Sequence, residues 1–107
     1  MKGFQARVVL LLILVTIFVL SCEKDHHRVT LTWQAPAPIP GVTVVGYNVY
    51  RSDVSGRGYV RIAARISTAK YEDRRVERGR TYFYVVTALD QVGRESRFSG
   101  EAKAQIP

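Results

Sequence analysis

This chain of 107 residues has few of the residue types that build disulfides, metal centres and catalytic dyads. It contains one cysteine, Cys22, so no intramolecular disulfide can form and an apolar core must hold the fold. The two histidines, His26 and His27, are adjacent, and neighbouring side chains on an extended chain point in opposite directions. We therefore predict no metal site, no cofactor and no catalytic triad, because both histidines precede the expected domain.

Acidic residues are also scarce, since nine stand against 16 lysines and arginines, and the formal net charge is +7. The cations are scattered along the chain and do not form one run. This pattern favours a solvated basic surface with a general attraction for anionic surfaces. After Cys22 no segment shows sustained apolar periodicity of 3.6 residues, which argues against a helical fold.

The longest apolar stretch runs from Val8 to Leu20, behind two cations. A basic start, an apolar run and a small residue before a polar segment are typical of a secretory signal. Because Ser21 is followed directly by Cys22, this segment resembles a bacterial lipoprotein signal. The resemblance implies a signal peptide over residues 1–21, acylation of Cys22 as the first mature residue, and a lipidated tether over residues 22–28.

Other interpretations of the apolar run stay open. It is shorter than the roughly 20 apolar residues of a transmembrane helix. It could be an ordinary cleaved signal, an uncleaved anchor, or a buried core helix of the kind that runs of 10–14 apolar residues often form.

The lipoprotein resemblance also implies an address. The membrane would be a partner through acylated Cys22, and the protein would be exported. In diderm bacteria an Asp after the acylated cysteine commonly signals retention at the inner membrane. Here Glu23 follows Cys22, which favours the outer membrane if the cell has one.

Short alternating segments follow the tether. Val29–Trp33 alternates apolar and polar residues with period two, as a half-buried strand does. Further strands are expected over residues 46–51, 59–63, 67–71, 81–89 and 100–106. Turn residues separate them, including a proline-rich loop after Gln34. Six or seven short strands at regular spacing predict an all-β antiparallel sandwich.

Three motifs give residues 29–107 a resemblance to the fibronectin type III domain. Trp33 and the proline after it are similar to the family's tryptophan strand, and Gly46–Arg51 is similar to its next strand. Residues 76–88 follow the pattern of its E–F corner and sixth strand. The resemblance implies an immunoglobulin-like sandwich in which the hydroxyl of Tyr82 returns to backbone a few residues upstream.

Alternation assigns the side chains of these strands to two faces. The residues expected to face the core are Val29, Leu31, Trp33, Tyr47, Val49, Tyr71, Tyr82, Tyr84, Val86 and Ala88. The residues expected to share the opposite face are Asn48, Tyr50, Phe83, Val85 and Thr87. Tyr50, Phe83 and Val85 would form an outward apolar patch, a candidate binding site, although scattered outward apolar residues are also ordinary on sheets.

The family's usual first strand has little room in this chain, because only residues 23–28 separate Cys22 from Val29. We therefore expect the first strand to be short or missing and Val29–Trp33 to lie at a sheet edge. Such an edge could accept a strand from another copy. Coverage of the edge by residues 24–27 is the alternative.

Together these features predict a non-catalytic, lipid-anchored module of the cell envelope that binds a partner or acts as a spacer. Its partner would be an unknown envelope protein or a glycan, and not a nucleic acid. One alternative is an accessory subunit of a secreted carbohydrate-active or envelope enzyme, since bacterial domains of this family often accompany such enzymes. A structural building block of an envelope assembly is the other.

Overall fold

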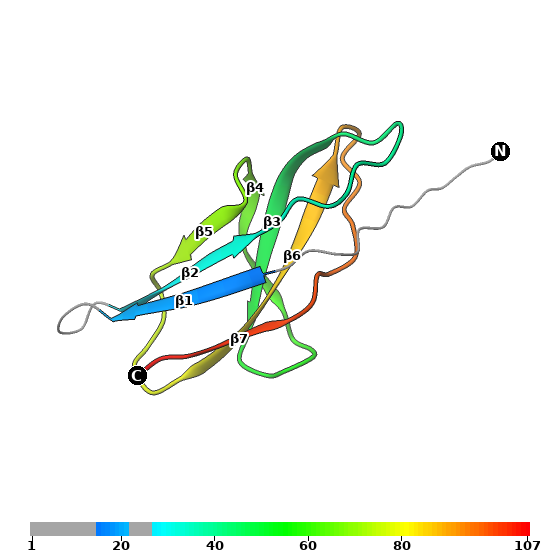
Figure 1. Cartoon of the computed structure of the whole chain (residues 1–107). Helices are drawn as coiled ribbons and strands as arrows, with labels where there is room; N and C mark the ends of the chain where they lie inside the picture. Colours follow the sequence, from blue (N-terminus) through cyan, green and yellow to red (C-terminus); the bar gives the residue numbers. More distant parts are fainter. Residues whose placement is uncertain (1–14, 22–26) are drawn as a thin grey trace.

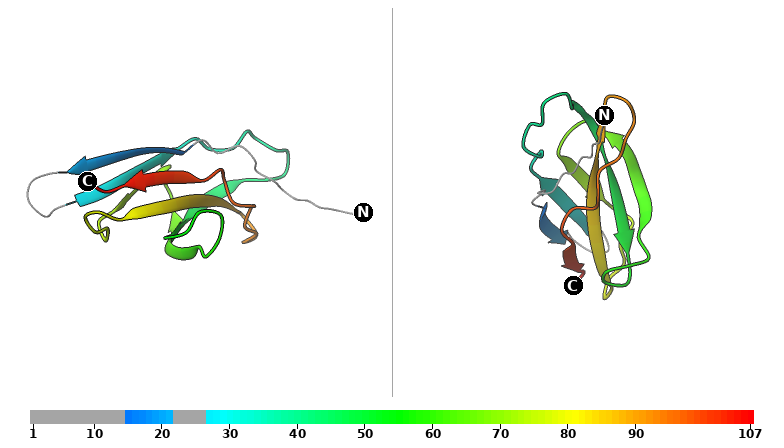
Figure 2. Two further views of the ribbon diagram at one scale, coloured as in Figure 1. Left: turned by 90° about the horizontal axis from the view of Figure 1, so that it is seen from below. Right: turned by 90° about the vertical axis from the view of Figure 1, so that its right-hand side faces the viewer.

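The computed structural model describes residues 15–21 and 27–107, and these ranges contain seven strands (Figure 1). The strands are β1 (Val15–Ser21), β2 (His27–Trp33), β3 (Val44–Ser52), β4 (Val60–Ile66), β5 (Lys70–Asp73), β6 (Thr81–Asp90) and β7 (Ala102–Gln105). They form a three-stranded sheet in the order β1-β2-β5 and a four-stranded sheet in the order β4-β3-β6-β7. All the pairings are antiparallel. The two sheets face each other as separate layers (Figure 2), which confirms the predicted sandwich.

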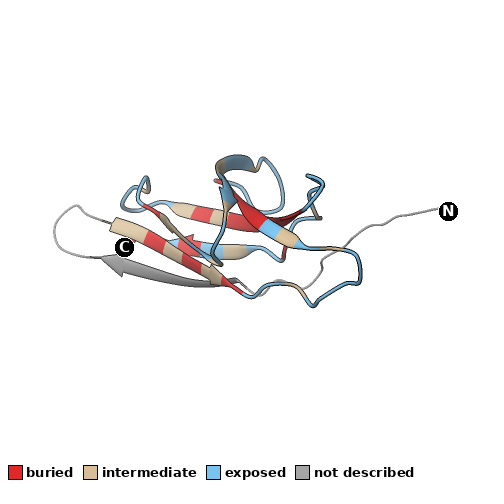
Figure 3. Ribbon diagram, turned by 90° about the horizontal axis from the view of Figure 1, so that it is seen from above, coloured by how far each residue is buried: buried red, intermediate tan, exposed pale blue. Residues whose placement is uncertain are grey.

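The core lies between the two sheets and is made by the side chains at alternate positions of the strands, those that point inward. Buried and half-buried residues alternate along most of β2 (Figure 3). The Trp33 ring packs edge-on against Tyr47, with centroids 5.3 Å apart. Of the residues expected to face the core, Tyr71 packs against the cluster half-buried, and the other nine are buried in it.

The expected corner tyrosine makes its predicted backbone contact. The hydroxyl of Tyr82 accepts a hydrogen bond from the backbone N–H of Glu77 at 3.0 Å, five residues upstream. The ring stays buried while its polar end is satisfied, which is the arrangement that a core tyrosine needs.

The first strand differs from the prediction. β1 pairs with β2 along its whole length, from Val15 opposite Trp33 to Ser21 opposite His27. Because β2 lies between β1 and β5, the expectation of a short or missing first strand, with Val29–Trp33 at a sheet edge, is wrong for this chain. The end of the apolar run is rich in β-branched residues, which suit a strand. This segment forms the first strand, for which residues 23–28 are too few.

Cys22 falls between β1 and β2, outside the described residues. The proposed signal peptide and its acylation site therefore stay predictions, as does the tether over residues 22–28. The structure adds that the last seven residues of the proposed signal form β1.

Candidate functional site

The outer face of the four-stranded sheet carries the residues that alternation placed opposite the core. In the pairing of β3 with β6, Asn48 lies opposite Thr87, Tyr50 opposite Val85 and Ser52 opposite Phe83. Tyr50 and Phe83 are half-buried, but Val85 is only 2% exposed. The prediction of an outward apolar patch at Tyr50, Phe83 and Val85 is therefore wrong at Val85.

The segment that follows β6 runs back along its edge. Ser96 and Ser99 each bond the β6 backbone twice. The N–H of Ser96 donates to the carbonyl of Ala88 at 2.9 Å, and the N–H of Ser99 donates to the carbonyl of Val86 at 2.8 Å. Their hydroxyls accept the N–H groups of the same two β6 residues, each at 2.9 Å. This pairing holds residues 96–99 beside the outer face and carries Phe98 over it.

Phe98 lies between two tyrosines in a row of aromatic rings. Its centroid is 5.1 Å from that of Tyr50 and 5.2 Å from that of Tyr59, and both contacts are edge-to-face. Phe98 remains 49% exposed, although it is a large apolar side chain. We call Tyr50, Phe98 and Tyr59 the aromatic row.

A carboxylate holds the hydroxyl of Tyr50 at one end of the row. Oε2 of Glu95 accepts hydrogen bonds from Thr87 Oγ1 at 2.6 Å, from Asn48 Nδ2 at 3.0 Å and from the hydroxyl of Tyr50. Partial desolvation opposes ionisation of Glu95, but these three donors outweigh it and lower the pKa of Glu95 below its ordinary value. Desolvation and the adjacent Glu95 together raise the pKa of Tyr50.

An irregularity in the neighbouring pair of strands orients Asn48. The register between β3 and β4 shifts around this residue, and Arg65 has a φ of 56°, a left-handed conformation that is uncommon outside glycine. Oδ1 of Asn48 accepts the N–H of Arg65 at 3.0 Å, so its amide nitrogen is directed to Glu95. The bulge thus contributes to the position of the carboxylate.

A second carboxylate holds the other end of the row. Oε1 of Glu101 accepts the hydroxyl of Tyr59 and the N–H of Gly56 at 2.8 Å, and Oε2 accepts Ser55 Oγ at 2.6 Å. The bonds from Ser55 and Tyr59 lower the pKa of Glu101. These contacts join the turn between β3 and β4 to the segment before β7.

An open depression of about 510 Å³ lies beside the aromatic row. It is lined by Tyr50, Thr87, Glu95, Ser96, Arg97 and Phe98. Sequence reasoning identified only Tyr50 of this set as a binding residue. Among the other residues, Phe98 could have been recognised from the sequence as a binding candidate, because it is a lone aromatic between polar residues in a segment expected to be a loop.

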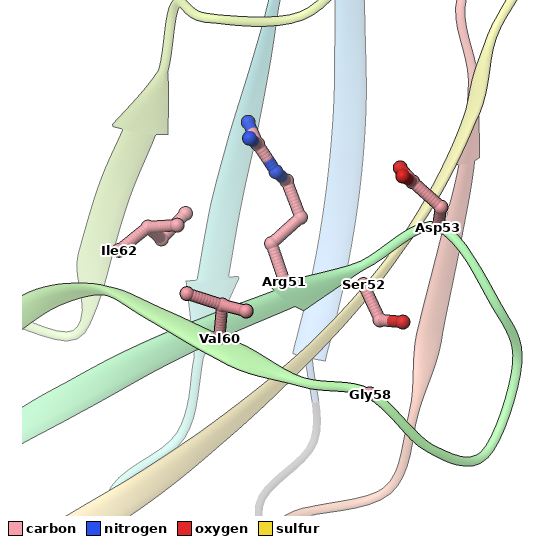
Figure 4. Close-up of a pocket in the computed structure, with 6 residues that line it drawn as sticks. All are labelled: Arg51, Ser52, Asp53, Gly58, Val60 and Ile62. Atoms are coloured by element: carbon pink, nitrogen blue, oxygen red, sulfur yellow. The ribbon is translucent and has the colours of Figure 1, made fainter.

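A second, smaller pocket of about 220 Å³ lies at the C-terminal end of β3. Figure 4 shows its lining, with Arg51 and Ser52 pointing to opposite sides of the strand. Nη1 of Arg51 donates to Oδ2 of Asp73 and to the carbonyl of Arg75, both at 2.9 Å. The same carboxylate oxygen accepts the hydroxyl of Tyr84 at 2.7 Å. The guanidinium of Arg51 therefore joins β3 of one sheet to β5 of the other through the buried carboxylate of Asp73, and the role of the residues around this pocket is structural.

Within residues 15–21 and 27–107, no three side chains of the His, Cys, Asp or Glu types are grouped so that they could hold a metal ion. Those ranges also contain no helix of the length and apolar character required to cross a membrane.

Comparison with known proteins places this architecture. A family model described as "Fibronectin type III domain SaeA third domain" matches residues 19–107. An amylopullulanase of Thermoanaerobacter thermohydrosulfuricus is 45% identical over 85 residues, which are 79% of this chain and 5% of the enzyme. An amylopullulanase of Thermoanaerobacterium thermosulfurigenes is 36% identical over 81 residues, 76% of this chain and 4% of the enzyme. This chain thus corresponds to a small segment of each enzyme.

A solved structure agrees with these matches. The crystal structure of an Fn3-like protein from Clostridium thermocellum is 41% identical, with a TM-score of 0.65, and the match covers 75% of this chain and 77% of that one. Sequence match, sheet order and corner tyrosine all lead to the same assignment. This chain belongs to the fibronectin type III family.

Proposed function

We propose that this protein is an exported, non-catalytic accessory module that is anchored by a lipid on Cys22 and contacts polysaccharide at the cell surface. The observation that carries the proposal is the 45% identity to a segment of an amylopullulanase, an enzyme named for its action on polysaccharides. The matched segment is only 5% of that enzyme. Most of that enzyme's chain therefore lies outside the segment that this chain matches.

The chemistry of the described residues supports a role in binding and not in catalysis. The carboxylates of Asp73, Glu95 and Glu101 each accept two or more hydrogen bonds from within the fold. The pKa of Glu95 and that of Glu101 are both lowered, which suits a permanently ionised hydrogen-bond acceptor. A general acid would instead need a pKa raised towards neutrality.

Anchoring is supported by the N-terminal pattern. A basic start, an apolar run and Ser21–Cys22 together resemble a lipoprotein signal. Acyl chains on one terminal cysteine would be enough for stable membrane attachment when two or more are present. The net positive charge would add attraction to anionic surfaces close to the membrane.

The anchoring part is tested by expressing the full chain in a bacterial host with labelled palmitate and recording the intact mass. We expect a mature protein that starts at Cys22 and carries the label, and a Cys22→Ser variant that carries none. Unlabelled wild-type protein, or a mature N-terminus elsewhere, would contradict lipidation.

The binding part is tested by native electrophoresis of the unprocessed chain, residues 1–107, through gels that contain amylopectin or pullulan. We expect retardation relative to a polysaccharide-free gel, with bovine serum albumin as the non-binding reference. Equal mobility in all the gels would contradict polysaccharide contact and leave the spacer role as the function.

A further inference from the structure

We propose that the aromatic row and the depression beside it form the subsite that binds a neutral glucan chain. This inference rests on the proposed function and gives it a location. It assigns Phe98 as the ring on which a sugar stacks, and it assigns Glu95 and Arg97 as the groups that bond the sugar hydroxyls.

The first observation is the exposure of Phe98. The ring is 49% exposed while edge-to-face contacts with Tyr50 and Tyr59 fix its position, so about half of a large apolar side chain is open to a partner. Aromatic side chains are enriched where proteins bind partners, because they offer large rigid contact areas at low entropic cost. The apolar face of a pyranose ring is a flat partner of matching size.

The second observation is that both neighbouring tyrosines are fixed by carboxylates. The hydroxyl of Tyr50 donates to Glu95 and that of Tyr59 donates to Glu101, across sequence separations of 45 and 42 residues. These long-range contacts set the geometry of the row before any ligand arrives, which lowers the entropic cost of binding. A hydroxyl that donates still has lone pairs, so each tyrosine can also accept a hydrogen bond from a sugar.

The third observation is the set of polar groups in the depression. Oε2 of Glu95 takes the bonds from Asn48, Tyr50 and Thr87, while Oε1 accepts none from the described part of the chain. Arg97 is exposed, lines the same depression and has no ion pair within the described ranges. A carboxylate acceptor and a guanidinium donor together suit a sugar hydroxyl, which both donates and accepts.

The groups that line the site match the hydroxyls and apolar ring faces of a glucan. The depression of about 510 Å³ is shallow and open, which suits a chain that lies along the surface. The pKa of Glu95 and that of Glu101 are lowered, so a carboxylate stays ionised at each end of the row near neutral pH. The apolar ring faces of a glucan would contact the exposed Phe98 ring, and its hydroxyls would bond the ionised Glu95 and the guanidinium of Arg97.

The test is affinity electrophoresis of the full-length protein in gels that contain amylopectin, pullulan or polygalacturonate. We expect wild-type protein to be retarded by at least one of the two glucans and not by polygalacturonate. Phe98→Ala should weaken glucan binding at least fivefold, and Arg97→Ala by about threefold. Phe98→Tyr should bind as wild type does, because a ring is retained.

Val92→Ala is the matched control, since Val92 is 67% exposed on the same connecting segment but does not line the depression. Near-ultraviolet circular dichroism checks the fold of each variant. If Phe98→Ala fails to fold, Arg97→Ala decides, because its side chain lies on the surface.

The outcomes are distinguishable. Retardation of wild type that neither Phe98→Ala nor Arg97→Ala reduces would overturn this location while leaving polysaccharide contact intact. Stronger retardation by polygalacturonate would overturn the ligand class. No retardation of wild type by any glucan would overturn both this subsite and the polysaccharide part of the proposed function.

Discussion

The two sheets of this sandwich use their outer surfaces differently. The three-stranded sheet is narrow, and one of its edges is β1, which comes from the apolar N-terminal run. The four-stranded sheet is wider, and residues 95–99 are bonded along β6 beside its outer face. The aromatic row and its two carboxylates gather on this second sheet.

This contrast separates what holds the fold from what is available to bind. The three-stranded sheet contributes Val29, Leu31 and Trp33 to the core, together with the buried carboxylate of Asp73. Changes there should lower stability. Changes on the outer face of the four-stranded sheet should have small effects on stability, because its side chains contact solvent as well as one another. Each prediction below tests one side of this division.

The largest effect is expected from removing β1. A protein that begins at Cys22, as the proposed mature form does, lacks the strand that pairs with β2 at seven positions. At about 1 kcal/mol net for each ladder hydrogen bond, the loss of unfolding free energy is on the order of 5 kcal/mol. Urea unfolding of the full chain and of residues 22–107 measures the difference. Equal midpoints would show that β1 contributes nothing to the sandwich.

Trp33→Ala comes next, because it removes the large ring that the end of β2 contributes to the core. Trp33 is 5% exposed and packs on Tyr47, so truncation should cost about 3–5 kcal/mol. Trp33→Phe should cost only about 1 kcal/mol, since Nε1 has no hydrogen-bond partner within the described ranges and the ring contact is kept. Val60→Ala is the control, because Val60 is 64% exposed and its truncation should leave stability nearly unchanged. A Trp33→Phe cost as large as that of Trp33→Ala would show that the indole N–H matters.

Asp73→Ala should cost about 3 kcal/mol, because Asp73 is the polar link between the sheets. Its carboxylate comes from β5 and receives Arg51 from β3 and Tyr84 from β6, at 2.9 and 2.7 Å. Removing it leaves the buried hydroxyl of Tyr84 unpaired and the guanidinium without its counter-charge. Asp53→Ala is the matched control, since that side chain is 62% exposed and its ion pair with Arg80 spans 3.4 Å. Similar urea midpoints for the two variants would contradict a structural role for the link.

The part of the fold that could be predicted from the sequence depends on local rules. The alternation of Val29, Leu31 and Trp33 predicts which residues are buried, because successive side chains of a strand point to opposite faces. The same rule correctly places Tyr50 and Val85 on the outer face. It cannot predict that Val85 is only 2% exposed, because burial of an outward residue depends on contacts beyond its own strand.

β1 and the candidate site were missed for similar reasons. An apolar run before a cysteine has the composition of an export signal, and its β-branched residues suit a strand equally well. The composition of the run does not reveal that it pairs with β2, because that pairing is a contact with another segment of the chain. Phe98 and Glu95 lie in a segment that reads as a turn and a loop. Their role follows only when long-range contacts bring Tyr50 and Tyr59 beside them.

The smallest effect is expected on the outer face, in the pH dependence that Glu95 contributes. Its pKa is lowered below 4.5 in the folded protein, so ionised Glu95 stabilises the fold above that pH, and the contribution is lost as the pH falls through the folded value. Because Glu95 is exposed, the contribution should be under about 1 kcal/mol. Wild type should therefore exceed Glu95→Gln in stability at pH 7 by a margin that shrinks below about pH 4.5. Thr87→Val, which removes one donor, should raise the pKa of Glu95 measured by NMR titration. A margin that stayed constant down to pH 3, with an unchanged pKa in Thr87→Val, would mean that the bonds at Glu95 do not hold the row.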